Sequence, residues 1–126
     1  FASTPATDQR QVNEMVRSLS ADLLPVGVDL GKAKAWCFYS QSSGATITSS
    51  YNIESITDTA TGKADFVYAV PFKSARTAVF GTCDDGYFDP TSIASTGVQG
   101  RTRNFGGSLT DQGQVSIIVF GELENE

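Results

Sequence analysis

From residue 33 to the end of the chain, apolar and polar residues alternate in short runs. A period of two is typical of β-strands that bury one face. In residues 64–70, for example, Phe66, Tyr68 and Val70 fall on one side of the expected strand. Glycine, proline, aspartate or serine bounds each run, as turns favour. The pattern predicts strands at 33–39, 45–53, 64–70, 76–83, 99–105 and 113–123.

About seven short strands at this spacing indicate an all-β fold, either a sandwich or a small barrel. We expect a small antiparallel β-sandwich, the head domain, over residues 34–126. At 126 residues the chain has the length of one ordinary domain. Within residues 49–72, Asp58, Thr61 and Gly62 supply turn chemistry, so we interpret this stretch as part of the scaffold and not as a binding loop.

Residues 8–24 follow a helical period instead. Thr7 or Asp8 can cap a short N-terminal α-helix, which Pro25 and Gly27 would end. Its narrow apolar stripe consists of Val12, Val16, Leu19 and Leu23. The stripe resembles that of a coiled coil, so the helix either packs on its own domain or self-associates, and we favour self-association. The expected organisation is an N-terminal arm and helical stalk at 1–24, a linker at 25–33 and the β-head at 34–126.

Charge and hydropathy exclude several classes of partner. The net charge is −5, and the nine lysines and arginines are scattered, so we expect no nucleic-acid partner. No apolar run approaches the roughly 20 residues that span a bilayer, so we expect no membrane insertion. The chain shows no secretory signal pattern. Because it begins with Phe1 instead of Met, we expect further residues upstream.

The residue types exclude the commonest catalytic sites. Without histidine, neither a Ser–His–Asp nor a Cys–His arrangement nor a histidine-containing zinc site can form. Phosphate-binding glycine motifs are also absent from the sequence. We therefore expect no enzyme activity, no cofactor and no metal. Cys37 and Cys83 lie in apolar runs, and we favour free buried thiols over a single disulfide.

Residues 84–108 hold the candidate ligand-facing side chains. Asp84, Asp85 and Asp89 lack the spacing of a calcium loop, so a plain solvated loop is favoured over a ligand rim or a cation site. Tyr87 and Phe88 beside these acids can stack on a sugar, or can instead plug a subunit seam.

Arginines occupy alternate positions further along the same region. Arg101 and Arg103 would lie on one side of a strand together with Phe105. We favour an exposed strand face over a patch that binds sugar or carboxylate.

A longer block carries a family resemblance. It comprises Lys34-Ala35-Trp36, residues 50–58 (SYNIESITD), Thr61-Gly62, Phe66-Val67-Tyr68, Pro71-Phe72 and Ala78-Val79-Phe80-Gly81. In this order the residues resemble the small C-terminal β-domain of bacteriophage tail fibres and related virion appendages. The match covers 34–82, departs at Cys37 and Phe38, and does not extend to 83–108.

The resemblance implies a structural virion protein of a tailed phage, assembled in the host cytoplasm as a homotrimer and contacting other virion proteins. It also implies host-surface attachment, with a cell-surface glycan as a further partner. The side chains expected at the trimer seam are Val12, Val16, Leu19, Leu23 and Trp36. Trp36 is expected in the core or at the interface. Alternatives are a capsid decoration or head-fibre protein anchored by its N-terminal arm, and a lectin-like glycan-binding module.

Overall fold

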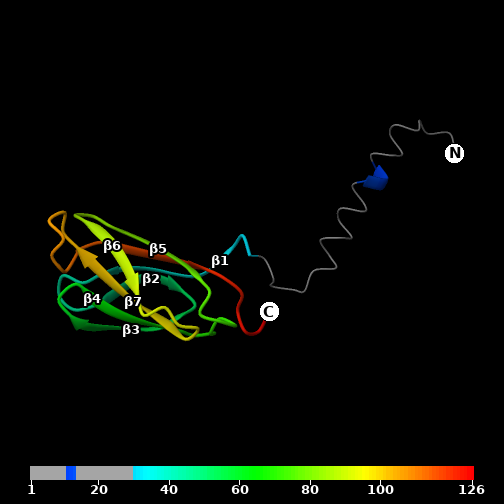
Figure 1. Ribbon diagram of the computed structural model, residues 1–126, viewed down its shortest axis with the longest axis horizontal. Helices are drawn as coiled ribbons and strands as arrows, with labels where there is room; N and C mark the ends of the chain where they lie inside the picture. Colours follow the sequence, from blue (N-terminus) through cyan, green and yellow to red (C-terminus); the bar gives the residue numbers. More distant parts are fainter. Residues whose placement is uncertain (1–10, 14–29) are drawn as a thin grey trace.

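The computed structural model describes residues 11–13 and 30–126, and the latter form a β-sandwich (Figure 1). Its strands are β1 (Ala33–Ser40), β2 (Thr46–Tyr51), β3 (Ile53–Ala60), β4 (Lys63–Tyr68), β5 (Ala78–Cys83), β6 (Tyr87–Thr91), β7 (Gly97–Arg103) and β8 (Val115–Phe120). The first sheet has the order β2-β1-β8-β5 and the second β3-β4-β7-β6. All strand pairs are antiparallel, so the predicted all-β sandwich is confirmed.

The strands depart most from the predicted runs in two places. The run 45–53 divides at Asn52, whose φ of 57° turns the chain from the first sheet into the second. Asparagine tolerates this left-handed conformation better than most residues do. The stretch with Asp84, Asp85 and Asp89, expected to be a plain solvated loop, contains most of β6. Pro90 is accommodated because β6 lies at a sheet edge, where a missing N–H donor leaves no ladder bond unmade.

The hairpin between β3 and β4 is tighter than its polar sequence suggested. Asp58 and Ala60 belong to β3, and the turn consists of Thr61 and Gly62 alone. Gly62 has a φ of +68°, and an added Cβ would lie 2.6 Å from the carbonyl oxygen of Thr102. Both the conformation and the space therefore require glycine, which confirms the predicted turn at this residue.

The core lies between the sheets and is built from the inward side chains of alternating positions. Phe66 and Tyr68 of β4 are buried as the pattern predicted, with ring contacts to Tyr39 and Phe72. The remaining core residues are Ala35, Cys37, Ala64, Val98, Val115, Ile117, Val119 and Leu123.

The expected N-terminal helix lies mostly outside the described residues. Residues 11–13, which include Val12, are helical and exposed. Val16, Leu19 and Leu23 lie outside the described part of the chain, as do residues 1–10 and most of the expected linker.

Candidate functional site

Four of the predicted ligand-facing residues lie at one end of the sandwich, which we call the distal tip. It comprises residues 41–44, 60–63, 83–87 and 103–112, opposite the end where residues 30–33 lead into β1 (Figure 1). Asp84 and Asp85 lie in its β5–β6 turn, and Tyr87 begins β6 directly opposite Arg103, the last residue of β7. The antiparallel register therefore brings together Tyr87 and Arg103, which are 16 residues apart in sequence.

Two exposed aromatic side chains and a half-buried arginine lie at the tip. Tyr87 is 43% exposed and Phe105 79% exposed. Arg103 Nη1 donates to the carbonyl oxygen of Gly107 at 3.0 Å. The hydroxyl of Tyr87 lies near the same glycine, 3.8 Å from where its Cβ would be. The tip thus presents two exposed aromatic rings and a partly exposed guanidinium group.

Phe105 does not lie on the face of a strand, as its spacing from Arg103 suggested. It lies in the turn after β7, where the amide of Gly107 donates to Asn104 O and the amide of Ser108 donates to Asn104 Oδ1. The Asn104 side chain closes this turn and leaves Phe105 at its apex, exposed to solvent.

A buried glutamine fixes the acidic turn. Gln112 is buried, and its amide both accepts from the N–H of Asp85 at 3.2 Å and donates to the Asp85 carbonyl at 3.0 Å. A backbone bond from the amide of Asp84 to Gln114 O adds a third tie. Sequence patterning missed Gln112, because a glutamine among polar residues gives no periodic signal.

A second buried glutamine, Gln41, holds the β3–β4 hairpin in place. Its buried Nε2 donates to the carbonyl of Lys63 at 2.8 Å, and its backbone amide donates to Gln112 O at 2.9 Å. The amide of Gly62 donates to Asp111 Oδ1 at 2.7 Å. These bonds join loops from both sheets, so the tip is a cross-linked frame and not a set of independent loops.

Phe88 departs from its expected place in a receptor-facing loop. Because Tyr87 faces outward, the next residue of β6 faces inward, and its ring packs against the core. Added Cβ atoms at Gly81 and Gly100 would lie 2.3 Å and 2.7 Å from that ring. Phe88 therefore fills the space between the sheets and cannot stack on a ligand.

Arg101 and Arg103 share the outer face of the second sheet, as their alternate positions indicated. Arg101 Nη2 bonds to Asp89 Oδ2 at 2.7 Å, and Arg103 Nε lies 3.6 Å from the same oxygen. Asp89 thus partly neutralises both guanidinium groups, and it is separated from the Asp84–Asp85 turn by Tyr87. Asp89 therefore lies apart from Asp84 and Asp85, and the three acids do not form the ligand rim that was the less favoured alternative.

The remaining chemistry in the described residues is sparse. No group of three or more histidine, cysteine, aspartate or glutamate side chains there is placed to hold a metal ion. Cys37 and Cys83 are free thiols, as favoured, although Cys83 is only half-buried. Burial raises the pKa of Cys37 to about 11. The pKa of Cys83 is also raised, and burial is the largest cause. Neither thiol is an activated nucleophile.

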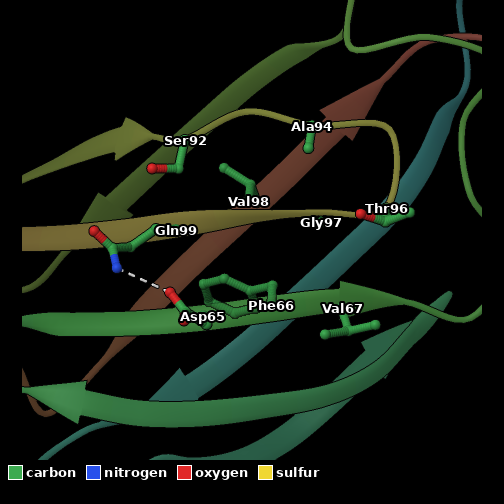
Figure 2. A pocket seen from close by; sticks show the side chains of 9 residues that line it. All are labelled: Asp65, Phe66, Val67, Ser92, Ala94, Thr96, Gly97, Val98 and Gln99. Atoms are coloured by element: carbon green, nitrogen blue, oxygen red, sulfur yellow. Dashed lines mark hydrogen bonds between the residues drawn. The ribbon is translucent and has the colours of Figure 1, made fainter.

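A shallow groove of about 340 Å³ lies over β4 and β7, beside the loop at 92–96 (Figure 2). The polar groups on its floor bind each other, since Gln99 Nε2 donates to Asp65 Oδ1 at 2.9 Å. The phenyl ring of Phe66, which lies below, belongs to the core. The groove therefore offers neither an exposed aromatic surface nor an unpaired charge.

Trp36 lies on the outer surface of the first sheet, half-buried and not in the core. Its ring contacts that of Phe38, with centroids 5.4 Å apart. No helix in the described part of the chain is long and apolar enough to cross a membrane.

Comparison with known proteins adds no assignment. No family model, no curated protein and no solved structure matches this chain. Function must therefore follow from the geometry of the tip and of the sheet surfaces.

Proposed function

We propose that this chain is a structural virion protein of a tailed bacteriophage, a homotrimeric fibre-type head that attaches the particle to the host surface. The observation that supports this function is the placement of the tip. Exposed Tyr87 and Phe105, with half-buried Arg103, stand on a cross-linked frame at the end opposite to residues 30–33. A head mounted on an N-terminal stalk would present this end outward. The resemblance of residues 34–82 to tail-fibre domains agrees with this function.

Attachment of this kind needs no catalysis. An aromatic side chain stacks on the apolar face of a sugar ring, and a guanidinium donates to its hydroxyl or carboxylate oxygens. Because Gln112 and Gln41 fix the loops beforehand, little conformational entropy is lost on binding. One tip would bind weakly, but several copies on one head raise the overall affinity by avidity, on the order of 10²-fold or more.

Two measurements test the proposal. Gold-labelled antibody against the chain should mark the ends of tail appendages in virions that contain it. Labelling spread over the capsid would instead support the decoration protein, and unlabelled virions would refute a virion role.

The second measurement is adsorption. Purified full-length chain should compete with phage for host cells, and the double variant Tyr87→Ala, Phe105→Ala should lose this competition. The matched control is Val67→Ala, an exposed apolar residue of β4 in the second sheet, away from the tip. If the tip variant competes as well as the unmodified chain, the tip is not the attachment surface.

A further inference from the structure

The outer surface of the first sheet carries a continuous row of large apolar side chains, which we call the aromatic face. Tyr51, Trp36, Ile118 and Phe80 are direct partners across β2, β1, β8 and β5, so they project from the same side. Tyr51 is 53%, Ile118 38% and Phe80 61% exposed. Exposed Phe38 and half-buried Phe120 extend the row, with ring contacts to Trp36 and Phe80 respectively.

This face lacks charge. The four strands of the first sheet contain a single charged residue, Lys34. Lys34 is 5% exposed, and its ammonium bonds to Glu126 and to the carbonyl of Gly121. The other outward positions of these strands hold serine, threonine or alanine.

The second sheet is the internal comparison, because every one of its strands carries charge. The charged residues are Glu54 and Asp58 on β3, Lys63 and Asp65 on β4, Asp89 on β6, and Arg101 and Arg103 on β7. An antiparallel sheet that faces water usually alternates apolar and polar residues in this way. The first sheet departs from that rule on its outer side, so its outer side is built to be covered.

The dimensions suit a protein interface. Four strands spaced about 4.8 Å apart and about 20 Å long make a footprint of roughly 400 Å². The row of apolar side chains occupies part of this footprint, and the largest apolar patch on a soluble protein, typically about 300–600 Å², is often functional. A groove of about 230 Å³ between Phe80 and Ile118, bordered by Thr82 and Ser116, can accept a side chain of the partner.

We infer that the partner on the aromatic face is a second copy of this chain. Copies that each carry a net charge of −5 repel one another, and the face without charge is where they meet at the least electrostatic cost. The face is also continuous with the N-terminal segment, because residues 30–33 run directly into β1, which bears Trp36 and Phe38. Copies joined through a stalk would therefore bring their β1 strands together.

This inference deepens the proposed function, since a fibre-type head needs a surface on which its copies meet. It also names residues other than the N-terminal stripe as determinants of assembly. Large aromatic side chains in the centre of an interface contribute most of its binding energy, so Trp36 and Phe80 are the expected anchors.

The oligomeric state of the full chain tests the inference. Light scattering with size-exclusion chromatography should show an oligomer at micromolar concentration, and Phe80→Glu should weaken its association at least about 30-fold. The matched control is Val67→Glu, which adds the same charge at an exposed apolar position of β4, on the outer side of the second sheet. This control should remain oligomeric.

Trp36 supplies a readout that needs no variant, because it is the single tryptophan of the chain. On dilution through the dissociation range, its emission should shift to the red and its quenching by acrylamide should increase. This keeps the test decisive if Phe80→Glu proves unfolded by circular dichroism.

Three outcomes would overturn the inference. A chain that is monomeric throughout, with Trp36 shielded, would mean that its own N-terminal segment covers the face. A monomer with Trp36 freely quenched would mean that the face stays open. An oligomer that survives Phe80→Glu but dissociates on Val16→Asp would place the contact in the N-terminal stripe alone. An oligomeric chain that is missing from virions would remove the proposed function and leave this interface in place.

Discussion

At the scale of single residues, glycines determine how closely the two sheets approach around Phe88. Gly81 of β5 and Gly100 of β7 both face the ring, and a Cβ on either would come within 3 Å of it. The ring of Phe88 is therefore closely flanked on both sides. Glycine is required here by close packing and not by an unusual φ.

Replacing Gly81 with alanine should therefore destabilise the fold. We expect Gly81→Ala to lower the free energy of unfolding by about 1–3 kcal/mol, as overpacking of a core typically does. Urea denaturation would measure the loss. The control is Gly113→Ala, where the added Cβ would make only an ordinary contact, 3.4 Å from Ser42 Oγ. Equal stability of the two variants would show that the Phe88 ring can shift.

A second residue-scale feature is the buried ion pair of Lys34 and Glu126, whose side chains are almost fully shielded. Burial by itself raises the pKa of Glu126. The hydrogen bonds from Lys34 Nζ and from the Leu123 amide, with the attraction of the Lys34 charge, outweigh burial and leave that pKa below its ordinary value. The carboxylate form is thus favoured by folding.

This lowered pKa predicts a stability loss on acidification. Glu126 contributes its full stabilisation above about pH 4.5, its ordinary pKa, and loses it as the pH falls through the lower pKa of the folded state. Glu126→Gln should be less stable at neutral pH, and its difference from the unmodified chain should shrink towards pH 3. Thermal melts at several pH values would measure this. A difference that is constant with pH would contradict the assignment.

At the scale of elements, the tip loops are held by side chains of other loops more than by their own turns. Gln112 bonds both backbone groups of Asp85, and Gln41 bonds the carbonyl of Lys63 across the sandwich. The β5–β6 turn therefore depends on the loop before β8, although Asp85 and Gln112 are 27 residues apart in the sequence.

Removing the Gln112 amide should loosen the β5–β6 turn. We expect Gln112→Ala to cost about 1–3 kcal/mol, because both backbone groups of Asp85 lose their partner. Hydrogen exchange at the amides of residues 84–86 should accelerate, while exchange in β1 and β8 should follow the global stability. Gln114→Ala, at an exposed position of the same loop, is the control and should leave exchange unchanged. Unaltered exchange in Gln112→Ala would show that backbone bonds alone hold the turn.

At the scale of the whole molecule, different surfaces serve assembly and attachment. The aromatic face covers the outer side of the first sheet, whereas Tyr87 and Phe105 stand at the distal tip. The two surfaces share no residue, so their contributions can be separated by mutation.

Competition for host cells should reveal this separation. Phe80→Glu should leave each tip intact but abolish avidity, so its half-effective concentration should rise on the order of 10²-fold. Tyr87→Ala with Phe105→Ala should remain oligomeric and still lose competition. If Phe80→Glu competes as well as the unmodified chain, attachment does not depend on assembly.

The sequence by itself determined the all-β class, most of the strands and the turn at Gly62, because local periodicity and turn chemistry encode them. It also excluded histidine chemistry. The division at Asn52 was not predicted, because Asn52 adopts positive φ while its side chain bonds the backbone of Lys34 and Val70, which the fold brings to it. Edge strand β6 was missed, because Pro90 and the acids around it read as a loop.

Only the tertiary structure decided which apolar side faces the core. Residues 35–39 are apolar on both sides, so alternation within them could not rank Cys37 and Tyr39 against Trp36 and Phe38. Packing against the second sheet buries the first pair and leaves the second outside. Packing between the sheets likewise turns Phe88 inward and leaves Tyr87 facing outward. A strand's sequence sets which residues share a side, but only its partner sheet determines which side is buried, and hence which surface remains for other copies of the chain.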